Sequence, residues 1–193
     1  MMTVEIPISE WINNYPFYVD SREEYFKFRP FFTHIPENSI GVEIGTFEGY
    51  NALGICRYCN PKKLYLIDPY LVYDSPVDTN IWKQEDWENI FERAKKKLEE
   101  YPVEFIRKPS TESANKVPNG LDFVYIDGDH RYESVIEDIR TWYPKIKNGG
   151  LLGGHDLMES GVKDAVTTFV YSDLKNNPTL TFRWNDWWIT KQN

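Results

Sequence analysis

A glycine-containing turn at residues 43–49, Glu-Ile-Gly-Thr-Phe-Glu-Gly, has the residue types and spacing of a ligand-binding segment. It follows a short apolar run and precedes a helical pattern, so we expect it where a strand passes into a helix. In open α/β sheets that junction lies at the carboxyl edge, where ligands bind. Gly45 lets the backbone turn sharply beside a ligand, and Gly49 allows tight entry into the helix. We therefore expect the turn, including Thr46 and Phe47, to bind a cofactor.

The acid Glu43 indicates which kind of ligand the turn suits. A dinucleotide-binding turn has a glycine two residues before Gly45, whereas here a carboxylate would face the pyrophosphate. S-adenosylmethionine has no phosphate, and Glu43 can attract its ammonium or sulfonium directly or through water. Asp68 ends the next apolar run, nineteen residues after Gly49, close to the roughly 20-residue interval at which an acid reaches ribose hydroxyls. Together these residues predict an adenosyl site.

The same four positions resemble the class I S-adenosylmethionine-dependent methyltransferases. The first motif of that class is an acid-x-Gly-x-x-x-Gly turn, and the second is an acid that ends the next strand. The matching residues here are Glu43, Gly45, Gly49 and Asp68. The resemblance covers about residues 39–193, and it implies a doubly wound α/β domain that holds S-adenosylmethionine and transfers its methyl group.

Three motifs lie further along the chain. They are Phe-Val-Tyr-Ile-Asp-Gly-Asp-His-x-Tyr at 123–132, Asp-Ile-x-x-Trp-x-Pro at 138–144 and Gly-Gly-Leu-Leu-Gly-Gly-His-Asp at 149–156. This run resembles the small-molecule O-methyltransferase group that includes the macrocin-type sugar enzymes. In metal-dependent members, acids after the fourth and fifth strands bind a divalent ion beside the methyl donor.

Asp127 and Asp156 match those two acids, so the resemblance implies Mg²⁺ or another divalent cation between them. Asp127 is thereby assigned to catalysis and to the cofactor side of the site as well. The family's second acid is often followed by Asp or Asn, whereas Leu157 follows here and His155 precedes. Whether a metal is required stays open at this point.

His130 is the candidate general base for a substrate hydroxyl, because an imidazole titrates near neutral pH and this one follows the fourth predicted strand. A structural alternative is that Asp129 caps a helix beginning near Arg131, with His130 in its first turn. His155 admits the same two interpretations, catalytic or structural.

Two further segments are assigned by their place after a strand. Thr111 lies where enzymes of this class often contact adenine, but a helix start with Ser110 or Thr111 as its cap explains the segment equally well. The long connection of residues 69–82 is either a lid that excludes water from donor and acceptor or a surface excursion.

Short apolar runs alternate with helical patterns from residue 40 onward, which is typical of βα units around a parallel sheet. Strands are predicted over Ile40–Ile44, Leu64–Ile67, Val103–Ile106, Leu121–Ile126, Leu151–Gly154, Leu180–Trp184 and Trp187–Thr190, the last two joined through Asn185-Asp186 as a hairpin. A helix is predicted from Val162 to Leu174. The expected fold is a single doubly wound α/β domain, with a mostly parallel seven-stranded sheet, helices on both faces and a C-terminal antiparallel hairpin.

Residues 1–38 are rich in aromatic side chains among charges, and we expect them to form a helical segment that packs on the domain of residues 39–193. The surplus aromatics there and at Trp184, Trp187 and Trp188 would cover the core or make a homodimer contact.

The overall composition limits the partners. A chain of 193 residues with 41% hydrophobic residues suits one folded domain, and a net charge of −8 disfavours nucleic acid as a substrate. No apolar run approaches the roughly 20 residues that cross a membrane, and residues 1–10 lack a signal-peptide pattern, so a cytoplasmic location is expected. Cys56 and Cys59 are interpreted as buried structural residues, because zinc would need two further ligands.

These observations predict O-methylation of a small hydroxylated molecule, a sugar or a phenolic compound. Aminopropyl transfer, nicotinamide-dependent hydride transfer and a non-catalytic binding module on the same fold are the alternatives, because a fold by itself never establishes an activity.

Overall fold

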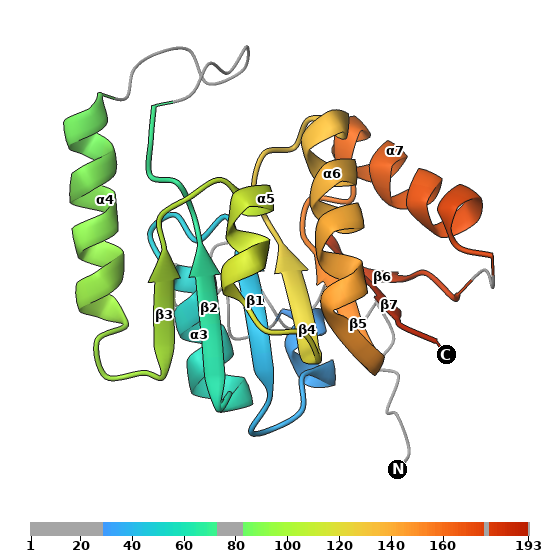
Figure 1. The fold of residues 1–193 in the computed structure, drawn as a ribbon, viewed down its shortest axis with the longest axis horizontal. Helices are drawn as coiled ribbons and strands as arrows, with labels where there is room; N and C mark the ends of the chain where they lie inside the picture. The colour runs from blue at the N-terminus through green and yellow to red at the C-terminus, as the bar shows by residue number, and fades with distance from the viewer. Residues whose placement is uncertain (1–28, 73–82, 176–177, 193) are drawn as a thin grey trace, which may run out of the picture.

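The computed structural model describes residues 29–72, 83–175 and 178–192, and within them the chain forms a seven-stranded sheet (Figure 1). The strand order is β3-β2-β1-β4-β5-β7-β6. The bounds are β1 (Ile40–Ile44), β2 (Lys63–Ile67), β3 (Val103–Ile106), β4 (Leu121–Ile126), β5 (Ile146–Gly154), β6 (Thr181–Arg183) and β7 (Asp186–Thr190). Strands β1 to β5 pair in parallel, and β7 is antiparallel to both β5 and β6. The mostly parallel sheet with a closing antiparallel hairpin is confirmed.

Helices cover both faces of the sheet, as a doubly wound fold requires. Helices α5, α6 and α7 lie on the face toward the viewer in Figure 1, and α3 lies behind the sheet. The helices are α3 (Tyr50–Cys59), α4 (Gln84–Lys97), α5 (Ser110–Ser113), α6 (Tyr132–Trp142) and α7 (Ser160–Thr168), with the 3-10 turns η1 (Pro30–His34), η2 (Ala114–Lys116) and η3 (Tyr143–Lys145) and the π-helical turn η4 (Phe169–Asp173).

The core has two apolar clusters, one on each face of the sheet. Val42 and Ile44 belong to the cluster under α6 and α7, whereas Leu64 and Phe123 belong to the cluster under α3 and η1. Because side chains alternate along a strand, Glu43 lies on the opposite side from its two apolar neighbours and points toward α3, where Asn51 meets it. This alternation places an acid inside the protein directly before the glycine turn.

The strand ends that carry the predicted motifs are in register. Ile44, the last residue of β1, lies opposite Ile67 of β2 and Ile126 of β4, and Ile126 lies opposite Gly154 of β5. The residues that follow these four strands therefore emerge side by side at one edge of the sheet.

The bounds of four strands differ from those predicted. Strand β5 begins at Ile146 and not at Leu151, because residues 147–149 are exposed and the pairing with β4 is irregular there, which hides the strand pattern. The hairpin turn is Trp184-Asn185, so Asp186 is the first residue of β7 and not part of the turn. Strand β6 is shorter than predicted, and β2 begins one residue earlier.

The helix predicted over Val162–Leu174 is α7 followed by η4. The α-helix runs from Ser160 to Thr168, and its last turn then widens into the π-helical turn that ends at Asp173. The apolar stripe of the prediction, including Val162, Val166 and Phe169, is buried in the core as expected.

Most of the expected N-terminal helical segment, residues 1–28, lies outside the described residues. The described part forms η1, in which Phe31 is fully buried, with its ring centroid 5.0 Å from that of Tyr125. Cys56 and Cys59 are buried free thiols in the second half of α3, and burial raises the pKa of each to about 12. No helix within residues 29–72, 83–175 or 178–192 has the length and apolar character that crossing a membrane requires.

Candidate active site

The glycine turn is pressed against the loop that follows β4. The Gly45 backbone N–H donates to the carbonyl oxygen of Ile67 at 2.8 Å, and the Gly45 φ angle is +84°. A Cβ atom at this position would lie 2.0 Å from the carbonyl oxygen of Asp127, so only glycine fits. The turn thus brings the end of β1 into contact with the backbone of the predicted acid at the end of β4.

Asp68 ties the turn to the end of β2. Its Oδ2 atom accepts the Phe47 backbone N–H at 2.9 Å and its Oδ1 atom accepts the Tyr70 backbone N–H at 2.8 Å. The Tyr70 hydroxyl donates back to the Phe47 carbonyl at 2.9 Å. Burial raises the pKa of Asp68 against these bonds and the nearby Arg107. Because each carboxylate oxygen has a second lone pair, Asp68 can still accept hydrogen bonds from ribose hydroxyls.

Glu43 is a fully buried acid whose two carboxylate oxygens differ in their hydrogen bonding. Asn51 donates to its Oε1 atom at 2.8 Å, while Oε2 has no hydrogen-bond partner among the described residues. Burial raises the Glu43 pKa to about 8, and Asp127 adds to the rise against the Asn51 hydrogen bond. A cation beside Oε2 would stabilise the ionised form, and this orphaned oxygen fits a ligand that carries an ammonium or a sulfonium.

The remaining residues of the predicted cofactor set lie at the same edge of the sheet. Thr46 is buried, whereas Phe47 has φ of 47° and packs its ring edge against Trp87, with 6.0 Å between centroids. Thr111 is half-buried in α5, directly after β3. The helix has Pro109 as its N-cap, so the prediction that Ser110 or Thr111 caps it is wrong. Residues 73–82 of the predicted lid lie outside the described residues.

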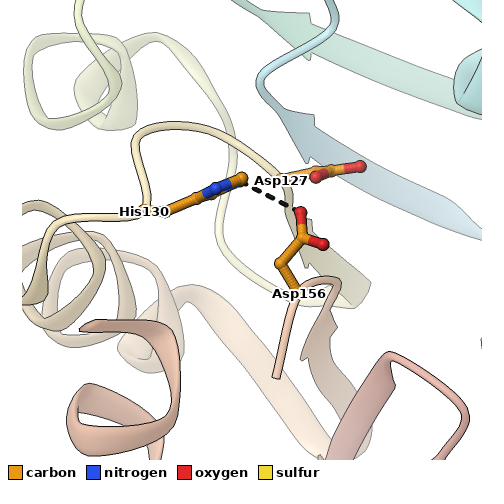
Figure 2. A group of neighbouring side chains, drawn as sticks. All are labelled: Asp127, His130 and Asp156. Carbon is orange, nitrogen blue, oxygen red and sulfur yellow. Dashed lines mark ion pairs between the residues drawn. The ribbon is translucent and has the colours of Figure 1, made fainter. Parts of the chain in front are cut away.

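Asp127, His130 and Asp156 converge at the loops after β4 and β5 (Figure 2). One ligand atom from each lies within 4.8 Å of the others. The His130 Nε2 atom is 3.1 Å from Asp156 Oδ2, the contact drawn as a dashed line in Figure 2. His155 Nδ1 is 3.0 Å from Asp156 Oδ1, so both predicted histidines contact the same carboxylate.

The two acids of this cluster are shifted in opposite directions. Burial and the neighbouring Asp156 raise the Asp127 pKa, although Arg29, His155 and His130 oppose the rise. Burial also acts to raise the Asp156 pKa, but hydrogen bonds from His130 and His155 outweigh it and hold this pKa well below its ordinary value. The bond to Asp156 raises the His130 pKa against burial. Asp156 is therefore the more acidic of the two carboxylates.

The alternative prediction, that His130 lies in the first turn of a helix, is wrong. Helix α6 begins at Tyr132, so His130 lies in the preceding loop and not in the first helical turn. Asp129 does secure the helix start, since its Oδ1 atom accepts the Arg131 backbone N–H at 3.0 Å and its Oδ2 atom accepts the Ser134 hydroxyl at 2.8 Å. Asp129 therefore stabilises the start of α6, whereas His130 contacts Asp156.

Sequence reasoning missed a buried network beneath Asp127. Arg29 NH1 donates to the Tyr125 hydroxyl at 2.7 Å and to Asp186 Oδ1 at 3.0 Å, while its NH2 atom lies 3.9 Å from Asp127 Oδ2. The Tyr125 hydroxyl also contacts Asp186 Oδ1 at 2.9 Å. Arg29 immediately precedes η1, whereas Tyr125 lies in β4 and Asp186 in β7. No local motif marks them, because their partners are distant in sequence.

Comparison with known proteins identifies the family. A family model described as a methyltransferase domain matches residues 42–157, more than half of the chain. The chain belongs to this methyltransferase family. The uncharacterized protein R132 of Acanthamoeba polyphaga mimivirus is 32% identical over 111 residues, 58% of this chain. The chain spans about half of that relative, 48% of its length.

Solved structures agree on the fold. The O-methyltransferase NovP has a TM-score of 0.62 at 19% identity, over 89% of this chain and 80% of its own. SMU.1697c of Streptococcus mutans in complex with SAH has a TM-score of 0.62 at 15% identity, over 90% and 99%. An rRNA methylase from Streptococcus thermophilus has a TM-score of 0.59 at 14% identity, over 100% of both chains. The family model confirms the resemblance to class I S-adenosylmethionine-dependent methyltransferases, and these structures show the same fold.

Proposed function

We infer that this methyltransferase transfers the methyl group of S-adenosylmethionine to a hydroxyl oxygen of a small molecule. The observation that carries this inference is the convergence of two clusters at one sheet edge. The turn with Glu43 and Asp68 forms one cluster, and Asp127, His130 and Asp156 form the other. The contact between Gly45 and the Asp127 backbone joins them. A donor held by the first cluster would have its reactive end beside the second.

The donor side is supported by three groups. Asp68 would bind the ribose hydroxyls, Glu43 would face the positive end of the donor, and Thr46 and Phe47 would contact it along the turn. Thr111 on α5 would contact the adenine. When bound, S-adenosylmethionine would supply an electrophilic methyl carbon with its sulfur as the leaving group, and these residues would hold it in line with the acceptor oxygen.

The acceptor side is supported by the pair of His130 and Asp156. An imidazole that donates its Nε2 proton to Asp156 has its lone pair on Nδ1, where it can take the hydroxyl proton as the oxygen attacks. Asp156 would then stabilise the imidazolium that forms, as the acid of a catalytic triad does. His130 is thus the proposed general base.

A divalent ion is a proposal supported by the donor set. Two carboxylates and one imidazole with ligand atoms within 4.8 Å of one another form a set that Mg²⁺ or Mn²⁺ accepts. Asp127 and Asp156 would hold the ion. When bound, it would supply a Lewis acid that lowers the pKa of a substrate hydroxyl.

A small acceptor is favoured over nucleic acid by charge. The net charge of −8 would repel a phosphate backbone, although an rRNA methylase shares the fold. A hydroxyl acceptor such as a sugar or a phenol is supported by the motif at residues 123–132 and by the shared fold of NovP, an O-methyltransferase.

Calorimetric titration with S-adenosylmethionine, SAH and NAD tests the donor. We expect binding of the two adenosyl compounds only, and loss of this binding in Asp68→Ala. Turnover on a panel of sugars, phenols and RNA, with and without a chelator, tests acceptor and metal. Binding of NAD in place of the adenosyl compounds would refute the donor assignment, and full activity with a chelator would refute the ion.

A further inference from the structure

The turn that joins β6 to β7 reaches the loop after β5. The Asn185 side chain donates from Nδ2 to Asp156 Oδ1 at 2.8 Å and accepts the Met158 backbone N–H on Oδ1 at 3.1 Å. The Asn185 carbonyl accepts the Leu157 backbone N–H at 3.2 Å. Three hydrogen bonds from one residue therefore fix the loop that carries Asp156.

This use of an asparagine is unusual for a turn. Asparagine side chains in turns ordinarily bond to their own backbone within two residues. Both side-chain bonds of Asn185 instead cross to residues 27 and 29 positions away, at Met158 and Asp156. The Asn185 side chain thus stabilises the neighbouring loop and not its own turn.

Asp156 needs such external support. Its φ angle is 56°, in the left-handed region that few non-glycine residues adopt. Strain of this kind persists where surrounding contacts enforce it, and it is concentrated at functional sites. The bonds from Asn185 fall on the Asp156 side chain and on the two residues that follow it, and the Trp187 indole N–H donates to the His155 carbonyl at 3.2 Å.

The next residue of the hairpin, Asp186, is linked to the other acid of the site, Asp127, through Arg29. Asp186 is almost fully buried, accepts the Phe31 backbone N–H at 3.2 Å on Oδ2 and binds Arg29 on Oδ1 at 3.0 Å. Arg29 in turn places its NH2 atom 3.9 Å from Asp127. Two successive residues, Asn185 and Asp186, thereby connect to the two acids of the site.

We propose that Asn185 is a positioning residue of the methyl-transfer site, which holds the Asp156 carboxylate toward His130, and that Asp186 holds Asp127 in place through Arg29. The proposal deepens the proposed function and rests on it for its catalytic meaning. The geometric part, that Asn185 sets the direction of the Asp156 carboxylate, stands independently of the reaction.

The experiment compares wild type with Asn185→Ala and Asn185→Asp. Asn185→Ala removes both side-chain bonds. Asn185→Asp keeps an oxygen for the Met158 N–H but replaces the donor that faces Asp156 with an acceptor. The control is Asn119→Ala. Asn119 is also a loop asparagine, lies before β4 at the opposite end of that strand from Asp127, is itself exposed and accepts a bond from Lys145.

Mn²⁺ serves as the probe of the two acids, measured by electron paramagnetic resonance on the full chain. Loss of a residue that orients a metal ligand typically weakens metal binding by about 10–100-fold, and we expect this range for Asn185→Ala. Asn119→Ala should bind Mn²⁺ as wild type does. S-adenosylmethionine affinity should change less than about twofold in all variants, because Asn185 contacts neither Glu43 nor Asp68.

Crystal structures of the wild type and both Asn185 variants provide a readout that needs no metal and no acceptor. We expect Asp156 Oδ2 to move beyond the hydrogen-bond range of about 3.5 Å from His130 Nε2 in both variants. An unmoved carboxylate, or equal loss of Mn²⁺ affinity in Asn119→Ala, would overturn the positioning role. A wild-type chain that binds neither S-adenosylmethionine nor Mn²⁺ would refute the proposed function, and the crystal structures would still decide the geometric part.

Discussion

Gly45→Ala tests the contact between the two halves of the site. The substitution adds one carbon, which would lie 2.0 Å from the Asp127 carbonyl oxygen and 2.7 Å from the Gly128 Cα atom. Both neighbours are backbone atoms, so the clash cannot be relieved by a side-chain rotation. The end of β1 and the loop after β4 must separate, and the glycine turn must move away from Asp68.

The loss of folding stability in Gly45→Ala has two parts. A φ angle of +84° costs an alanine about 1–2 kcal/mol, and forcing a methyl group into a packed site typically costs about 1–3 kcal/mol more. We expect the free energy of unfolding to fall by about 2–5 kcal/mol. In a chain of this size 1 kcal/mol corresponds to roughly 2–4 °C in Tm, so Tm should fall by about 4–20 °C.

Gly120→Ala is the matched control. Gly120 has φ of +87°, almost the same as Gly45, but an added Cβ would meet nothing within 4 Å. It should cost only the backbone part, about 1–2 kcal/mol, and leave S-adenosylmethionine binding unchanged. Scanning calorimetry and ligand titration of both variants separate the two contributions. A Gly45→Ala variant no less stable than Gly120→Ala, with wild-type affinity for the methyl donor, would refute the reasoning.

Three further outcomes are expected. Burial raises the Glu43 pKa from 4.5 to about 8, so the folded state binds the proton more tightly than the unfolded state does. The free energy of unfolding should therefore fall as the pH rises across that window, by up to about 1.4 kcal/mol per pH unit. Glu43→Gln should flatten this slope in urea titrations at about pH 5 to 8.5, and an unchanged slope would contradict the prediction. Arg29→Met leaves Asp186 buried without its cation and should lower the free energy of unfolding in urea by about 3–5 kcal/mol. Its control, Arg140→Met, breaks an exposed pair with Asp173 and should lower it by less than about 1 kcal/mol. Similar losses in the two variants would contradict the importance of the buried network. His130→Gln should lower kcat by about 10²–10⁴-fold without changing donor affinity, and retained turnover would remove His130 as the base.

The placement of the candidate donor-binding residues could be predicted because its signals are local. Strand β1 is a short, mostly apolar run that ends in a glycine turn, and strand β4 has four apolar residues, 123–126, directly before Asp127. Both strands have the predicted bounds. Parallel strands place their carboxyl ends at one edge, so the convergence of Glu43, Asp68 and Asp127 follows from the strand assignment.

The rest of the site depends on contacts between distant residues. Asp186 looks like a turn residue in the sequence, yet it is buried at the start of β7 because Arg29 and Tyr125, 157 and 61 positions away, satisfy its carboxylate. Asn185 likewise acts on a loop that a sequence pattern cannot place beside it. Local propensity has no access to such pairs, since they exist only once the sheet has formed.

The two buried thiols of α3 provide a natural reporter of local opening. Cys56 and Cys59 are the chain's two cysteines, and with a pKa of about 12 each they are protonated and shielded from alkylating reagents in the native state. Labelling therefore requires α3 to separate from the Phe32 carbonyl that Cys59 contacts at 3.6 Å. Since α3 starts directly after the glycine turn, the alkylation rate would report how often the turn and α3 open locally. A bound methyl donor should slow this alkylation.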